Sequence, residues 1–195
     1  MTGFAIDKGV DLYFDIAKDS QVVLESETFT GRVAFDIAMP ALVKQGDWGD
    51  YARGAKFALQ KRFKLKTGIT GTIKGSIPVG GLSSSAAVLI AYVMAFAKAN
   101  DIELKPFEVM KIASEAEREY IGLNNGLLDQ ACIALGKKDH LLMLDCESNE
   151  YRLIPFGGQA NANRRQTESH QACLNHRNAK GEDEVSLSND TNKKT

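Results

Sequence analysis

Pro78-Val79-Gly80-Gly81-Leu82-Ser83-Ser84-Ser85-Ala86-Ala87 is the stretch that decides the fold, because it joins an alternating strand pattern to a long apolar helix pattern. Its glycines let the backbone come close to a ligand. The next helix begins with N–H groups that lack intrahelical partners, and the helix dipole adds positive charge there. Three successive serine hydroxyls could also ligate a magnesium ion carried by a nucleotide. The stretch is typical of a phosphate-binding turn, although glycine and serine are also ordinary turn and cap residues.

The rest of the chain alternates between strand and helix patterns. Period-two patterns predict neighbouring antiparallel strands at 10–16, 21–26 and 31–37, and later strands at 69–77, 140–146 and 151–156. Apolar residues at helical spacing predict helices over 47–63, with Asp47 as N-cap, and over 84–98, 106–121 and 127–135. The order predicts an α+β fold without an internal repeat.

Composition excludes several functional classes. A net charge of −1 over 195 residues argues against a nucleic-acid surface. The apolar stretch 86–97 is too short to span a bilayer. Cys132, Cys146 and Cys173 have no paired or metal-type spacing, and no secretory signal is recognised. We therefore expect a cytoplasmic protein that binds neither nucleic acid nor membrane.

Three motifs resemble those of the GHMP kinases. The string from Gly81 to Ala87 is similar to the central motif of that superfamily. The string Asn125-Gly126-Leu127-Leu128-Asp129-Gln130 narrows the resemblance to galactokinases, and Trp48 with Tyr51 and Gly54 resembles their Trp-x-x-Tyr-x-x-Gly helix near the adenine pocket. The resemblance covers about residues 3–156. It implies an incomplete GHMP kinase N-terminal lobe, a ribosomal-protein-like βαβ fold with a left-handed crossover.

The resemblance also implies a site and its cofactors, ATP and Mg²⁺. Asp129 would accept the proton of the sugar's anomeric hydroxyl as that oxygen attacks the γ-phosphate, and Gly126 would help to bind the sugar, with galactose as the expected hexose. Ser85 and Glu117 would hold Mg²⁺. The implied ATP-binding residues are Trp48, Gly80, Gly81, Leu82, Ser83, Ser84 and Ser85.

Residue types alone leave other interpretations open. Asp129 could be an ordinary carboxylate at a helix start, Glu117 part of a solvated acidic face, and Trp48 and Tyr51 simple core aromatics. His140 is better explained as a residue that begins a strand. A serine hydrolase is disfavoured because no Gly-x-Ser-x-Gly elbow occurs.

The chemistry of the chain changes after Phe156. From 157 to 195 there is no aromatic residue, and the large aliphatic residues are Leu174, Val185 and Leu187. We therefore expect residues 1–156 to form the partial domain and 157–195 a polar, disordered or non-native tail. The expected function is that of a fragment of a galactokinase-like kinase, which transfers the γ-phosphate of ATP to the anomeric hydroxyl of galactose. The alternative is a nucleotide- or sugar-binding remnant without kinase activity.

Overall fold

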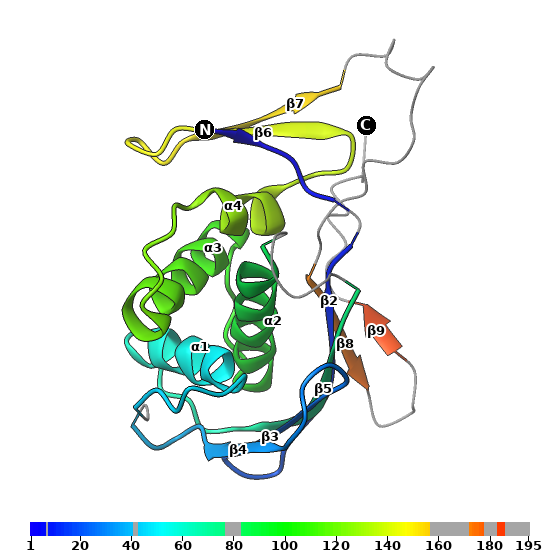
Figure 1. Ribbon diagram of the computed structural model, residues 1–195, viewed down its shortest axis with the longest axis vertical. Coiled ribbons are helices and arrows are strands. Elements are labelled where there is room, and N and C mark those ends of the chain that lie inside the picture. The colour runs from blue at the N-terminus through cyan, green and yellow to red at the C-terminus, as the bar shows by residue number, and fades with distance from the viewer. Residues whose placement is uncertain (7, 41–42, 77–82, 157–171, 178–182, 186–195) are drawn as a thin grey trace.

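The structure is a computed structural model that describes residues 1–6, 8–40, 43–76, 83–156, 172–177 and 183–185. Four α-helices lie between a larger curved sheet and a smaller sheet (Figure 1). The predicted α+β fold is confirmed. The described helices include none with the length and apolar character needed to cross a membrane.

The larger sheet has six strands, and its inner face forms one wall of the main hydrophobic core. Alternate residues of β2, such as Val10, Leu12 and Phe14, are buried against the helices. The strand order is β4 (Val33–Asp36), β3 (Gln21–Ser26), β5 (Ile69–Gly75), β2 (Val10–Ile16), β8 (Ala172–Arg177) and β9 (Asp183–Val185).

The prediction that the strands at 10–16 and 21–26 are neighbours is wrong. β5 lies between them, antiparallel to β2 and parallel to β3. The connection from β2 to β3 crosses the start of β5, where Ala17 N donates to Gly68 O at 3.0 Å and Gly68 N donates to Asp19 O at 2.8 Å. A Cβ atom on Gly68 would lie 2.0 Å from the carbonyl oxygen of Gln21, so this crossing requires glycine. Local periodicity identifies all three strands but not the order in which they pair.

The helices pack around α2 (Ser84–Ala99), which contacts the other helices and β2. The flanking helices are α1 (Asp50–Gln60), α3 (Pro106–Glu115) and α4 (Leu128–Leu135). The predicted helix over 106–121 has the predicted ends, but its last part is the π-helical turn η1 (Ala116–Ile121), which ends at Gly122 with φ of 84°. The N-cap of α1 is Gly49, not Asp47 as predicted. The carboxylate of Asp47 instead bonds to Arg53 and to the N–H of Gly49.

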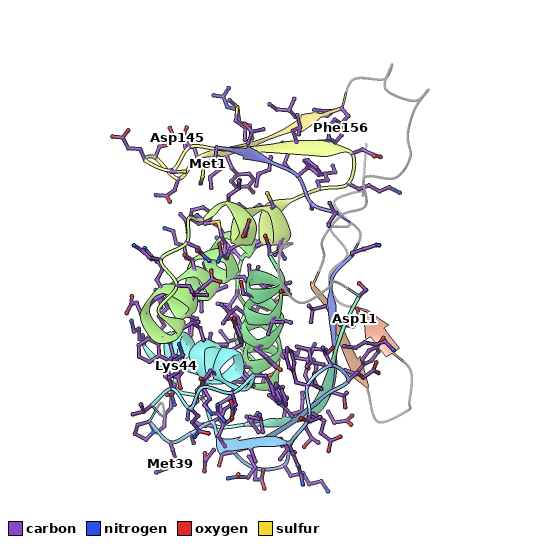
Figure 2. The ribbon with its side chains drawn as sticks, viewed as in Figure 1. Met1, Asp11, Met39, Lys44, Asp145 and Phe156 are labelled. Carbon is purple, nitrogen blue, oxygen red and sulfur yellow. The ribbon has the colours of Figure 1, made fainter. Side chains whose placement is uncertain are left out.

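The smaller sheet packs against α4, with strand order β1 (Thr2–Gly3), β6 (His140–Leu144) and β7 (Tyr151–Pro155). Leu142 and Leu144 of β6 join Met110 of α3 in a second hydrophobic cluster. Met1 extends the pairing of β1, because its carbonyl accepts a hydrogen bond from Leu144 N at 2.8 Å. Figure 2 shows Met1 beside the turn that carries Asp145. Sequence periodicity missed β1, which is too short to show alternation.

The segment after Phe156, for which the sequence predicts a polar, disordered or non-native tail, includes two short strands. Strand β8 pairs in parallel with β2, and β9 pairs antiparallel with β8. The pairing is made by backbone groups, so a polar sequence can join a sheet without a core of its own. The expectation of a disordered or non-native tail over 157–195 stays a prediction. Residues 157–171, 178–182 and 186–195 lie outside the described residues.

Candidate functional site

The start of α2 is the part of the implied phosphate-binding turn that the structure describes. Gly80, Gly81 and Leu82 lie outside the described residues, whereas Ser83, Ser84 and Ser85 lie within them. Ser83 is the N-cap, and its φ of 56° is in the left-handed region that non-glycine residues seldom adopt. Its side chain makes no capping hydrogen bond. The Ser83 side chain thus leaves the first-turn N–H groups of α2 available to an anion.

Ser85 and Glu117 are in direct contact, as the resemblance implies. The Ser85 hydroxyl donates to Glu117 Oε1 at 2.8 Å, and Gln130 Nε2 donates to Glu117 Oε2 at 2.5 Å. Glu117 is 2% exposed and Gln130 1% exposed. A carboxylate as buried as this needs such partners. The structure thereby joins α2, η1 and α4 at one carboxylate.

The solvated-face interpretation does not hold for Glu117, and of its two acidic neighbours Glu119 is 48% exposed whereas Glu115 is only 12% exposed. Lys61 forms ion pairs with Glu115 at 2.7 Å and with Glu119 at 2.5 Å near the surface. Glu117 lies in the π-helical turn, and its carbonyl accepts a hydrogen bond from Leu123 N at 3.0 Å. Single π-helical turns are frequent at functional sites.

A pocket of about 540 Å³, here called the inner pocket, brings the predicted adenine-binding and phosphate-binding residues together. Trp48 and Tyr51 line it near the start of α1, and Ser84 and Ser85 line it at the start of α2. Trp48 and Tyr51 also pack against the core, so the core interpretation and the pocket interpretation both describe them. Burial raises the pKa of Tyr51, and the negative charge of Glu117 raises it further.

The inner pocket extends along one face of α2. Ser85, Val88 and Tyr92 all line it, with the spacing of residues that share a helix face. The Tyr92 hydroxyl is buried and has no hydrogen-bond partner among the described residues. The wall of the pocket therefore contains a buried polar atom that none of the described residues satisfies.

Asp129 is the second residue of α4 and is half-buried. It immediately precedes Gln130, which contacts Glu117. Burial raises the pKa of the Cys132 thiol to about 11, and the charge of Asp129 also raises it. Asp129 does not line the inner pocket. Gly126 is exposed, with open space where a Cβ atom would lie.

The oxygens at Ser85 and Glu117 are of the hard type that Mg²⁺ prefers. Among the residues that the structure describes, no group of three or more His, Cys, Asp or Glu side chains could hold a metal ion. A magnesium ion here would therefore take further oxygens from phosphates and water, which is the usual arrangement for Mg²⁺ with a nucleotide. The residues present fit that arrangement.

Sequence reasoning missed two polar contributors to this region. Gln130 belongs to the motif 125–130 but has no predicted role of its own, and Arg53 is none of the residues that define the motifs. Arg53 is buried and pairs with Asp47 at 2.6 Å and with Asp50 at 2.9 Å. The spacing of Asp50 and Arg53, three residues apart on a helix, was the available signal.

Comparisons with known proteins agree with this geometry. Residues 50–137 match the family model of the GHMP kinases N terminal domain. A galacturonokinase of Arabidopsis thaliana is 37% identical over 173 residues, covering 79% of this chain and 41% of that protein. A galactokinase of Pyrococcus furiosus is 34% identical over 158 residues, covering 79% of this chain and 44% of that protein.

A solved structure of Lactococcus lactis galactokinase complexed with galactose matches with a TM-score of 0.73 and 27% identity. The match covers 79% of this chain and 41% of that one. The chain thus spans roughly two fifths of the length of the relatives it matches. Motifs, fold and comparisons lead to one conclusion: the chain contains a GHMP kinase N-terminal domain, similar to that of galactokinases.

Proposed function

We propose that this domain is the nucleotide-binding part of a galactokinase-like sugar kinase, which transfers the γ-phosphate of ATP to the anomeric hydroxyl of galactose. The observation that carries the proposal is the inner pocket, because it joins Trp48 and Tyr51 to the hydroxyls of Ser84 and Ser85. Aromatic rings suit a nucleotide base, and a helix start suits its phosphates.

The shape of the pocket gives the nucleotide a direction. Tyr92 follows Ser85 by seven positions, which corresponds to about 10 Å along α2. That length separates the phosphate end of the pocket, at Ser85, from the end lined by Tyr92. The positive helix end favours the triphosphate at Ser85 and disfavours the reverse orientation.

Mg²⁺ would be held by Ser85 and Glu117 together with the phosphates. When bound, it neutralises negative charge on the phosphates during transfer. Gln130 occupies Glu117 Oε2, which leaves Oε1 directed at Ser85. The buried amide therefore orients the carboxylate toward the start of α2.

Asp129 would act as the base that accepts the proton of the attacking sugar hydroxyl. Its neighbour Gln130 contacts Glu117, so α4 connects the proposed base to the proposed metal ligands. Gly126 would contribute to sugar binding. Galactose is the first candidate sugar, and the similarity to a galacturonokinase makes galacturonate the second.

A non-catalytic nucleotide-binding protein is the second candidate function. It is favoured by one observation, that the inner pocket is lined by Trp48, Ser84 and Ser85 but not by the proposed base Asp129. Both functions use the same inner pocket. They differ in turnover, because only a kinase consumes ATP in a galactose-dependent reaction.

The test uses the single tryptophan of the chain, Trp48, as a reporter of the pocket. We expect MgATP to change its fluorescence in a saturable way. Ser85→Ala should raise the Kd of MgATP about tenfold, because a charge-assisted contact worth about 1.5 kcal/mol is lost. The Kd of ATP measured with EDTA should change much less.

The matched control is Thr72→Val, which removes a hydroxyl on the outer face of the sheet, away from the inner pocket. Its Kd for MgATP should equal that of the wild type. A wild-type chain that binds no ATP would refute the proposal. Galactose-dependent ATP consumption separates the kinase from the non-catalytic protein.

A further inference from the structure

One face of α1 holds the segment that precedes the helix. Asp50, Arg53, Lys56 and Gln60 are spaced three or four residues apart, so they share this face. Lys56 Nζ donates to Asp36 O at 2.7 Å. Gln60 Nε2 donates to the carbonyls of Ile37 and Met39 at 2.9 and 2.8 Å. A polar helix face that would ordinarily meet water is thus covered by backbone.

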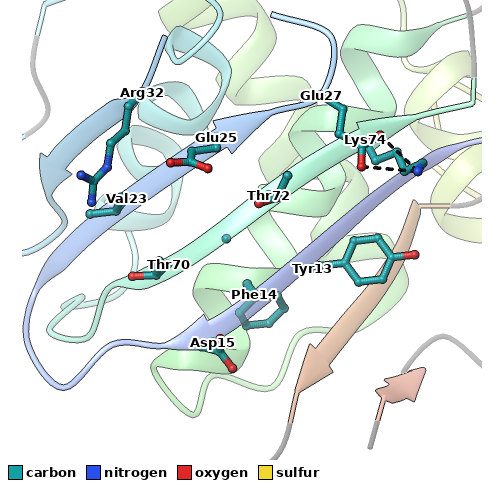
Figure 3. A pocket seen from close by; sticks show the side chains of 11 residues that line it. Tyr13, Phe14, Asp15, Val23, Glu25, Glu27, Arg32, Thr70, Thr72 and Lys74 are labelled. Atoms are coloured by element: carbon teal, nitrogen blue, oxygen red, sulfur yellow. Dashed lines mark hydrogen bonds and ion pairs between the residues drawn. The ribbon is translucent and has the colours of Figure 1, made fainter. Parts of the chain in front are cut away.

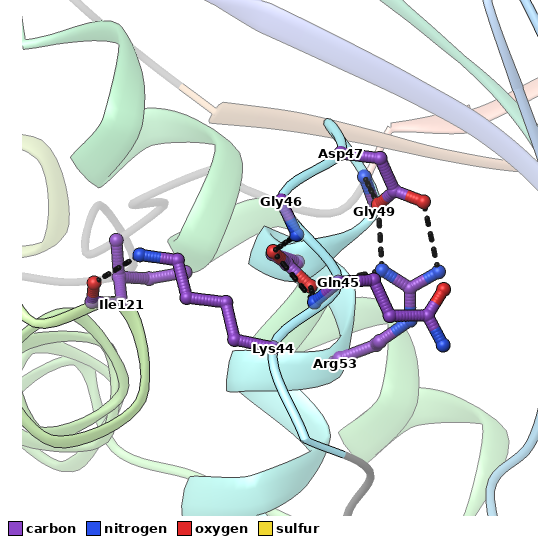
Figure 4. Close-up of polar contacts among 8 residues, drawn as sticks. Lys44, Gln45, Gly46, Asp47, Gly49, Arg53 and Ile121 are labelled. Carbon is purple, nitrogen blue, oxygen red and sulfur yellow. Dashed lines mark hydrogen bonds and ion pairs between the residues drawn. The ribbon is translucent and has the colours of Figure 1, made fainter.

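The contacts at the start of α1 are denser (Figure 4). The Asp50 carboxylate accepts hydrogen bonds from Gln45 N at 2.9 Å and from Gly46 N at 2.7 Å. Arg53 donates through both terminal nitrogens to Asp47, at 2.6 and 3.2 Å, and its Nη1 reaches Asp50 at 2.9 Å. The guanidinium therefore links the helix to the loop that leads into Trp48.

The same loop is also tied to η1. Lys44 Nζ donates to the carbonyl oxygen of Ile121 at 2.7 Å, at the last residue of η1 (Figure 4). Because η1 carries Glu117, this bond connects the loop to the element that holds the proposed metal ligand. The loop is fixed from two directions.

Burying these charges carries a desolvation penalty. The side chains of Arg53 and Asp50 are each 4% exposed. Arg53 Nε is buried without a hydrogen-bond partner among the described residues. A buried ion pair recovers its desolvation cost only when every polar atom is satisfied, so a gain in stability does not explain this network. What the network provides is a defined position for Gly46 and Asp47, both of which line the inner pocket.

We propose that Arg53 is a positioning residue for the nucleotide site: through Asp47 and Asp50 it fixes the wall of the inner pocket formed by residues 46–48. The inference rests on the proposed function for its ligand, and on the hydrogen bonds alone for the position of the wall. Arg53 itself does not line the pocket. Its effect on nucleotide binding is therefore exerted through the position of Trp48.

The test compares Arg53→Lys and Arg53→Met in the full chain, with Arg62→Met as the matched control. Arg62 also pairs with a carboxylate, Glu115, but it is 42% exposed and lies at the opposite end of α1. Three quantities are measured: the emission and acrylamide quenching of Trp48 without nucleotide, the Kd of MgATP, and the melting temperature.

Both Arg53 variants should make Trp48 more accessible to acrylamide, because lysine keeps the charge but cannot form the two parallel bonds. The Kd of MgATP should rise roughly ten- to a hundred-fold, the cost of misplacing a binding group by about an ångström. Arg62→Met should leave the quenching and the Kd at the wild-type values. A purely structural role predicts a lower melting temperature with unchanged quenching and Kd in the folded protein, and that result would overturn the proposal.

If Arg53→Met does not fold, Asp47→Asn provides the second variant, because it weakens the same link and leaves the Arg53–Asp50 pair in place. It should increase acrylamide quenching of Trp48, and unchanged quenching would overturn the proposal. Should the wild type bind no ATP, the proposed function fails, whereas quenching without nucleotide still decides whether Arg53 positions the wall.

Discussion

Two pockets of the domain have nearly equal volumes but are lined by different kinds of residues. The inner pocket measures about 540 Å³, and the outer pocket, on the face of the larger sheet that is turned away from the helices, measures about 530 Å³. Figure 3 shows the outer pocket, where Tyr13, Glu25 and Thr72 project from neighbouring strands. Volume alone therefore does not identify the site.

Most residues that line the outer pocket, such as Tyr13, Glu25 and Thr72, lie where alternation places side chains toward solvent. Its Lys74 and Glu27 form an ion pair at 3.1 Å in which both side chains are 53% exposed. Such pairs are weak and screened by salt. The inner pocket is instead lined by the start of α2, by Trp48 and by Tyr92, whose hydroxyl is buried. The buried carboxylate of Glu117 accepts a hydrogen bond from Ser85, which also lines the pocket. The comparison shows that binding chemistry depends on convergent, partly unsatisfied polar groups within an apolar wall.

The largest expected difference between the two sides of the domain is catalytic. In a complete galactokinase that carries this motif, Asp129→Asn should lower turnover by about a hundred- to ten-thousandfold, because an amide keeps the shape of the carboxylate but cannot accept the proton. Sugar binding should be retained. The measurement is the steady-state rate of galactose phosphorylation together with the Kd of galactose.

Glu25→Gln is the matched change on the outer face, since it also turns a carboxylate into an amide. Its turnover should be that of the wild type. A normal rate in Asp129→Asn would instead make Asp129 an ordinary carboxylate at a helix start, and the contrast between the two faces would then lack a catalytic basis.

The second expected difference is in stability. Gln130→Met keeps a side chain of similar size but leaves Glu117 Oε2 without its buried partner. We expect the free energy of unfolding to fall by about 1–3 kcal/mol, the cost of an unsatisfied buried polar group. Glu27→Gln, which breaks the exposed pair of the outer pocket, should cost at most about 1 kcal/mol. Denaturant unfolding of both variants gives the two values, and equal costs would contradict the comparison.

The sequence predicted the elements of the domain better than their arrangement. Periodicity identified α2 and the strands β2, β3 and β5, because buried faces impose local patterns. It could not place β5 between β2 and β3, since that order depends on a close contact between Gly68 and Gln21. It also missed β8, whose pairing is made by the backbone.

In the candidate site, too, the sequence predicted individual residues better than their arrangement. Family motifs pointed to Ser85 and Glu117, and the structure brings these two residues into contact. Residue types alone assigned Glu117 to a solvated face, because burial by a π-helical turn leaves no periodic signal. Only part of the Arg53 network leaves a signal in the sequence. Asp50 and Arg53 have helical spacing, whereas Asp47 and the backbone N–H of Gly46 belong to a loop, whose position no helical pattern encodes.

The smallest expected effect concerns acid stability at Asp47, which lines the inner pocket. The hydrogen bond from Arg53 is the main cause that holds the pKa of Asp47 below its ordinary value of 3.8, although burial acts in the opposite direction. The folded state therefore binds fewer protons here than the unfolded state does. The resulting stability is fully present above the ordinary pKa and is lost as the pH falls through the lowered one.

Asp47 is 44% exposed, so screening limits the effect to about 0.2–1 kcal/mol. Unfolding measured between about pH 5 and about pH 2 should show a shallower loss of stability in Asp47→Asn than in the wild type. Identical slopes in the variant and the wild type would mean that Arg53 does not hold Asp47 in solution.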